Sequence, residues 1–134
     1  MTQRTKLFCV ALTILFAGAI GCGQKLNIDR TITVGPMEVQ SILVDAPKGD
    51  QKLTVDVSSP GVPVNVYVVF DADQQAVKDL MLAGKAPDAS KFVAGQQKVE
   101  AVELTTLVPA GKAFGVMIGG AKKKTDVKVK VKGI

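Results

Sequence analysis

Carboxylates are the only abundant side chains here that could act as general acids or bases, because the 134-residue sequence contains no histidine. Glu100 and Glu103 are the obvious candidates for such a pair. Positions three apart on a β-strand face opposite sides of the sheet, so these two carboxylates would not converge on one substrate. Four serines have neither a histidine to activate them nor a lysine three residues further on: Ser41, Ser58, Ser59 and Ser90. We therefore expect no enzymatic activity, and an enzyme that uses carboxylates alone is the alternative.

The segment Asp71-Ala72-Asp73 begins like a calcium-binding loop, with alternating carboxylates that could point at one cation. The later ligand positions hold Gln75 and Val77, and the central glycine and the closing glutamate of such a loop are missing. A helix N-terminus with Asp73 as its cap explains the same residues. We therefore expect no bound metal and no other cofactor.

Six lysines near the C-terminus form the most distinctive charged feature of the sequence: Lys122, Lys123, Lys124, Lys128, Lys130 and Lys132. On one side of a strand next to a loop, they would form a positive strip that could contact anionic lipid headgroups or acidic polymers. The alternative, which we favour, is that lysines on an edge strand prevent edge-to-edge pairing. No aromatic residues alternate with the lysines, the chain has no tryptophan, and Tyr67 is its single tyrosine. Binding to nucleic acid is therefore not expected.

The first two dozen residues have the composition of a secretory signal. Arg4 and Lys6 precede an uncharged apolar run from Leu7 to Ile20, which is too short for a membrane-spanning helix. The residues that end this run, Ala19-Ile20-Gly21-Cys22, resemble the bacterial lipobox. The resemblance implies cleavage before Cys22 and a diacylglyceryl group on its thiol. An ordinary signal peptide with an incidental cysteine is the alternative.

These features divide the chain into a lipoprotein signal peptide at 1–21, a lipidated tether at 22–25 and one domain at 26–134. Lipid chains on Cys22 would hold the protein on a membrane while the rest stays in water. Residue 23 is glycine and not aspartate, from which we expect the outer membrane of a bacterial cell envelope rather than the inner one. The net charge is +5, and Arg4 and Lys6 contribute two of these charges, so the mature chain carries a mildly basic +3.

Strict alternation of apolar and polar residues predicts β-strands in the mature chain. Residues 52–58 place Leu53, Val55 and Val57 on one face, and residues 62–70 alternate in the same way. Between them, Ser59-Pro60-Gly61 has proline and glycine in the order of a type II turn. We therefore predict that these two strands form a hairpin that covers a core.

Further strands are predicted at 26–34, 37–45, 98–107, 114–118 and 127–131, with a loop over 85–97 that holds at most one short edge segment. Residues 71–84 change to a helical period, with Asp73 at the start and Gly84 at the end, and we expect this helix to cross from one sheet to the other. One sheet cannot bury all the apolar faces. The expected fold is an all-β, antiparallel, jelly-roll-like β-sandwich of seven to eight strands with one short helix.

The same strands resemble the bacterial pre-peptidase C-terminal domain family over about residues 39 to 133. The resemblance is carried by residues 42–49 (ILVDAPKG), 52–57 (KLTVDV) and 64–69 (VNVYVV), and by the turn at 108–111 (VPAG) with the strands that follow it. The chain departs from the family at Val64-Asn65-Val66-Tyr67, where an Asp-Leu-Tyr-like stretch is usual, and in its longer helical segment 73–84. The resemblance implies a non-catalytic accessory or binding module.

The sequence thus predicts a lipid-anchored cell-envelope protein whose β-sandwich acts as a non-catalytic binding or structural module. The alternative is an adaptor subunit that docks to a larger secreted or envelope protein assembly. The expected partners are the membrane, through the lipid on Cys22, and a protein or glycan of the envelope.

Overall fold

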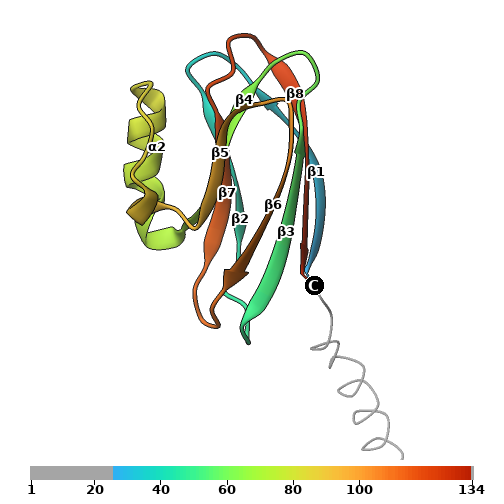
Figure 1. Cartoon of the computed structure of the whole chain (residues 1–134), viewed down its shortest axis with the longest axis vertical. Helices are drawn as coiled ribbons and strands as arrows, with labels where there is room; N and C mark the ends of the chain where they lie inside the picture. The colour runs from blue at the N-terminus through green and yellow to red at the C-terminus, as the bar shows by residue number, and fades with distance from the viewer. Residues whose placement is uncertain (1–25, 134) are drawn as a thin grey trace, which may run out of the picture.

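The computed structural model describes residues 26–133, which form two four-stranded antiparallel sheets packed face to face (Figure 1). Sheet A has the order β1 (Asn27–Val34), β8 (Thr125–Gly133), β3 (Gln51–Ser58), β6 (Ala101–Val108). Sheet B has the order β2 (Val39–Val44), β7 (Phe114–Gly119), β4 (Val64–Phe70), β5 (Ala94–Val99). The described residues contain one α-helix, α2 (Gln74–Leu82), and this architecture confirms the predicted antiparallel β-sandwich. The predicted signal peptide and lipidated tether lie outside the described residues.

The core lies between the sheets and is built mainly from valines of alternating strand positions. Leu53, Val55 and Val57 of β3 face Val64, Val66 and Val68 of β4, and all six are buried. Val127, Val129 and Val131 of β8 complete the inner side of sheet A. β-branched side chains fit the pleated inner faces of a sandwich, so the predicted inward faces of these strands are correct.

The predicted hairpin of β3 and β4 is wrong, because the two strands belong to different sheets. The turn between them has the expected geometry: Gly61 has φ +78°, and the Val62 amide donates to the Ser59 carbonyl at 3.3 Å. This type II turn carries the chain across the core from one sheet to the other. Both strands have one strongly apolar face, and these faces meet across the sandwich instead of lying side by side.

The sequence predicted that helix α2 crosses from one sheet to the other, and this prediction is wrong. The helix links β4 to β5, which both belong to sheet B, and lies on the outer face of that sheet (Figure 1). The interface is a second small apolar cluster: Tyr67, Val69, Val77, Met81 and Met117, with Val39 and Phe92 at its edge. The outward positions 115 and 119 of β7 are glycines, and a Cβ at Gly119 would lie 3.0 Å from the Met81 methyl group. The helix can therefore pack close to the sheet.

The two ends of α2 differ from each other in how they are capped. Asp73 occupies the N-cap position but makes no side-chain cap hydrogen bond, contrary to prediction. A 3₁₀ turn over Asp71–Asp73 precedes the helix, so the Asp73 backbone is already helical (φ −102°, ψ −3°) and not extended as a capping residue requires. At the other end, Gly84 (φ +74°) donates to Met81 and Lys85 to Leu80, the Schellman arrangement expected for a terminal glycine.

Strand β8 is a central strand of sheet A, between β1 and β3, so the edge-strand explanation of its lysines is wrong. The edges of sheet A are β1 and β6. On β1, Arg30 pairs with the buried Val129 and so occupies an inward register position, yet it is exposed. A charge in that position protects an edge strand from pairing with another chain.

The single strand predicted over 98–107 is wrong, because Glu100 separates β6 of sheet A from β5 of sheet B. Strand β5 begins at Ala94, within the predicted 85–97 loop, and is an edge strand, as expected for the short segment there. Its pairing with β4 shifts register between Val64 and Val66: Val99 lies opposite Val64, and Gln96 opposite Val66. Two residues, Gln97 and Lys98, therefore lie opposite the single residue Asn65. This β-bulge interrupts the alternation within residues 94–99, so the sequence pattern did not reveal β5 as a separate strand.

The register of β1 and β8 defines two ends of the sandwich. Asn27 lies opposite Lys132 at the lower end in Figure 1, where the chain enters the domain, and Val34 lies opposite Thr125 at the upper end. The connections 35–38, 59–63 and 120–124, together with Glu100, lie at this upper end, whereas 45–50 and 109–113 lie at the lower end. Within the described residues, no helix has the length and apolar character needed to cross a membrane.

Candidate functional site

The six lysines singled out in the sequence fall into two groups in the structure. Lys122, Lys123 and Lys124 lie exposed in the β7–β8 connection at the upper end. Lys128, Lys130 and Lys132 alternate with buried valines of β8 and point away from the core, over the outer face of sheet A. The two groups have different surroundings.

The strand lysines lie among carboxylates. Lys130 has Asp29 of β1 opposite it on one side and Asp56 of β3 on the other, and Asp56 in turn lies opposite Glu103 of β6. By the same register, the outer face of sheet A carries four lysines and four carboxylates: Lys52, Lys128, Lys130, Lys132, Asp29, Asp56, Glu103 and Asp126. The face is electrically balanced, so it attracts an anionic surface less than an isolated lysine strip would.

A shallow, open groove of about 490 Å³ lies on this face. Its lining consists of Asp56, Val57, Ser58, Ala101, Val102, Glu103, Lys128 and Lys130. The small side chains of Ser58 and Ala101, which lie opposite each other, leave the hollow between the longer charged residues. The groove offers charges of both signs but no activated nucleophile, because no histidine exists in the chain.

The upper end has a different character, because two connections between the sheets run side by side there. The 35–38 turn joins β1 to β2, and the 120–124 loop joins β7 to β8. They start and end at paired positions, since Val34 lies opposite Thr125 and Val39 opposite Gly119. The exposed residue at the tip of the turn, Met37, is therefore next to the loop that carries Lys122, Lys123 and Lys124.

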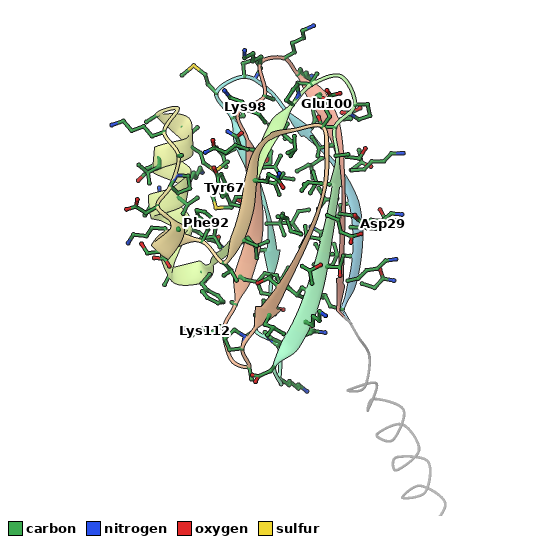
Figure 2. The ribbon with its side chains drawn as sticks, in the orientation of Figure 1. Asp29, Tyr67, Phe92, Lys98, Glu100 and Lys112 are labelled. Atoms are coloured by element: carbon green, nitrogen blue, oxygen red, sulfur yellow. The ribbon has the colours of Figure 1, made fainter. Side chains whose placement is uncertain are left out.

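Asn65 joins Lys98 to the same region. Its Oδ1 accepts a hydrogen bond from the backbone N–H of Lys98 at 2.9 Å, which holds the β5 bulge in place. Asn65 also lies opposite Gly119 in the β4–β7 pair, and its amide group occupies the space beside Gly120 where a Cβ would otherwise lie. Lys98 is thereby held beside the base of the 120–124 loop, and Figure 2 shows it at the upper end with Glu100.

Three carboxylates lie at or beside the upper end, and each accepts a hydrogen bond: Asp126 of β8 accepts from the Thr33 hydroxyl at 2.8 Å, and the other two accept from backbone amides. Glu38 Oε1 accepts from the Gly35 N–H at 2.6 Å, and Glu100 Oε1 accepts from the Gly61 N–H at 2.7 Å. Among residues 26–133 the one ion pair is Lys91 with Asp73, 3.9 Å apart beside α2. The lysines of the upper end are therefore free of carboxylate partners, and they outnumber the carboxylates there.

Two residues of the upper end have backbone conformations that L-amino acids rarely adopt. Met37 has φ +59° and Lys98 has φ +53°, and they are the non-glycine residues with positive φ in the described part of the chain. Met37 follows Pro36 in a turn closed by a 3.3 Å hydrogen bond from Glu38 N–H to Gly35 O, at a position where glycine or asparagine is usual. Its side chain is 82% exposed.

We call Met37, Lys98, Lys122, Lys123 and Lys124 the upper basic cluster. The three loop lysines could be identified from the sequence, whereas Met37, Lys98 and Asn65, which organises the region, were not. The signal for Met37 was local, since a bulky residue after Gly35-Pro36 occupies a turn position that glycine should hold. Nothing local could have identified Lys98, because the bulge depends on how β5 pairs with β4.

The candidate residues for catalysis and metal binding lie apart from one another or have structural roles. Asp73 pairs with Lys91, and within residues 26–133 no group of three or more carboxylate, cysteine or histidine side chains is arranged to hold a metal ion. Glu100 supports the 59–63 turn, whereas Glu103 lies on the outer face of sheet A. The buried hydroxyl of Ser59 donates to the Val62 carbonyl at 2.6 Å.

No family model matches the chain, and neither does any curated protein. Solved structures do resemble it. The crystal structure of the Yersinia pseudotuberculosis-derived mitogen aligns with a TM-score of 0.53 and 6% identity, over 79% of this chain and 84% of the mitogen. The pre-peptidase C-terminal domain of a collagenase from Bacillus anthracis aligns with a TM-score of 0.46 and 12% identity, over 78% of this chain and 89% of that domain. At these identities the likeness concerns the β-sandwich fold and not family membership.

Proposed function

We propose that this chain is a lipid-anchored protein of the bacterial cell envelope, on the outer membrane, whose β-sandwich is a non-catalytic binding module. The anchor is supported by the lipobox-like residues before Cys22. The binding role is supported by one observation above others: the upper basic cluster lies at the end of the sandwich opposite to the end where the chain enters. A module tethered at its lower end presents the cluster outward.

Simple lengths favour this orientation. The eight residues of β1 separate the two ends by about 23 Å at roughly 3.3 Å per residue. The tether of residues 22–25 spans at most about 14 Å when fully extended. If the upper end pointed straight at the anchoring bilayer, the start of β1 would be farther from the membrane than the tether reaches. The cluster is therefore suited to a partner other than the anchoring membrane.

An adaptor role, docking to a larger secreted or envelope assembly, is the second candidate. The observation that favours it is the exposed Met37 among the lysines, since an apolar side chain in a charged surface suits a protein partner better than a purely ionic one. In either role the β-sandwich acts by binding and not by catalysis.

The anchor is tested by the intact mass of the protein recovered from bacterial membranes, beside a Cys22→Ser variant. We expect cleavage before residue 22 with added acyl chains, and loss of both the acyl mass and the membrane fraction in the variant. An unmodified chain in the medium would refute the anchor and leave a secreted domain.

The orientation is tested by labelling lysines of the lipoprotein in reconstituted vesicles with a water-soluble acylating reagent. We expect Lys122, Lys123 and Lys124 to react as fast as in the detergent-solubilised protein. Lys48 and Lys112, in the connections of the lower end, should react more slowly on vesicles than in detergent. Figure 2 shows Lys112 at that lower end. The opposite pattern of protection would contradict the proposed orientation.

A further inference from the structure

We propose that the upper basic cluster is a docking site for an acidic protein surface, with Met37 inserting into an apolar pocket at the centre of the contact. This proposal rests on the binding role proposed above and names the class of partner. It does not depend on the lipid anchor. Three observations carry it: the contiguity of the cluster, its excess of positive charge, and the exposed apolar residue held in a strained turn.

The cluster is a preformed surface drawn from two connections and the bulge of β5. Paired strand positions flank both the 35–38 turn and the 120–124 loop, and Asn65 ties the Lys98 backbone to the base of that loop. Ala121, within the loop, is buried and joins the main core cluster, so the loop is attached to the domain between its two ends. A surface whose backbone is already in place loses little entropy on binding.

The charge of the cluster selects an acidic partner. Four lysines face three nearby carboxylates, and none of these carboxylates forms an ion pair with a lysine within residues 26–133: Glu38 and Glu100 accept hydrogen bonds from backbone amides, and Asp126 from the Thr33 hydroxyl. Lysine ammonium groups attract carboxylates and speed their encounter with the protein. The cluster has neither an arginine nor an aromatic residue, which would be expected for phosphate or nucleic-acid recognition.

The properties of Met37 favour an acidic protein over other polyanions as the partner of the cluster. A side chain that is 82% exposed contributes little to the core, and glycine or asparagine would satisfy the positive φ without strain. Strained residues that the fold does not need are found at binding sites. A flexible thioether adapts to an apolar pocket, which a protein surface provides and a polysaccharide chain does not.

The test uses the mature chain with Cys22→Ser, whose strand partners all lie within residues 27–133, so the domain folds without the anchor. Two glutamate-rich peptides serve as probes, one with leucine at every third position and one with serine there. Heparin and vesicles containing phosphatidylglycerol serve as the other anionic probes. Binding is followed by shifts of backbone amide resonances and by isothermal titration at two salt concentrations.

We expect the leucine peptide to shift resonances of residues 36–38, 97–100 and 120–125 and to bind about tenfold more tightly than the serine peptide, as burial of part of a leucine side chain predicts. Met37→Ser should abolish that preference and leave serine-peptide binding unchanged. Replacing Lys122, Lys123 and Lys124 by glutamine should weaken both peptides about tenfold and reduce the salt dependence. The same change at Lys128, Lys130 and Lys132, with an equal loss of charge, should leave binding unaltered.

Other outcomes overturn the proposal. Equal affinity for both peptides, or no effect of Met37→Ser, would show that no apolar contact is made. Heparin or vesicles binding more tightly than either peptide would assign the cluster to a polysaccharide or a lipid surface. Shifts confined to the groove on sheet A, or no peptide binding, would remove the docking site. An absent acyl group in the mass measurement would refute the anchor and leave this site untouched.

Discussion

Replacing Met37 by glycine should stabilise the domain, although it removes a large side chain. A non-glycine residue in the left-handed region is destabilised by about 1–2 kcal/mol, and Met37 has φ +59°. Glycine removes this strain but adds about 0.5–1 kcal/mol of unfolded-state entropy. Because the side chain is 82% exposed, little burial is lost. The net gain in the free energy of unfolding is therefore about 0.5–1 kcal/mol.

The measurement is urea unfolding followed by far-ultraviolet circular dichroism and by the fluorescence of Tyr67, the one tyrosine in a chain without tryptophan. With an m-value of about 1–1.5 kcal/mol per molar urea, the gain corresponds to a midpoint shift of about 0.3–1 M. Gly61→Ala is the matched control. Gly61 also has positive φ (+78°), and an added Cβ would meet no atom within 4 Å, so by the same balance of strain and entropy this variant should lose about 0.5–1 kcal/mol.

Opposite signs for the two variants would support the view that Met37 is kept at the expense of stability. If Met37→Gly leaves the midpoint unchanged or lowers it while Gly61→Ala behaves as expected, the Met37 side chain contributes to the fold. Such a result would refute the retention of Met37 for binding.

Three further predictions concern the sandwich itself. Val66→Asp places an unpaired charge at a fully buried position between the sheets and should abolish folding, and a cooperative melt near the wild-type midpoint would contradict the core assignment. Gly95→Ala introduces a methyl group into the ring of the buried Tyr67 and should destabilise the domain by about 1–3 kcal/mol in thermal or urea unfolding; unchanged stability and tyrosine fluorescence would count against the packing under α2. Glu103→Lys replaces a like-charge pair with Asp56 by an opposite-charge pair and should raise stability by about 0.2–1 kcal/mol at low salt, less at high salt; a loss would show that the cross-strand pairing is wrong.

The lysines show which features of the candidate site could be predicted from the sequence. Alternation with valine correctly placed Lys128, Lys130 and Lys132 on the outward side of a strand, because side-chain direction on a strand has a period of two residues. It could not show that Asp29 and Asp56 lie on either side of Lys130, since these residues come from strands far away in the sequence. The same limit hid Lys98, whose place in the cluster depends on a bulge and on Asn65 of another strand.

Local patterns thus determined the elements and the fold class: alternating valines require two-faced strands, and strands with one apolar face require a second sheet to cover it. The turn at Pro60-Gly61 and the terminal glycine of α2 were also predictable, because both depend on a few adjacent residues. Only the tertiary structure decided which strands pair, that β8 is central, that α2 covers sheet B, and that the turn with Met37 runs beside the loop with the lysines. These features depend on contacts between segments that are distant in the sequence. No short stretch of sequence distinguishes the native strand pairing from the many alternatives.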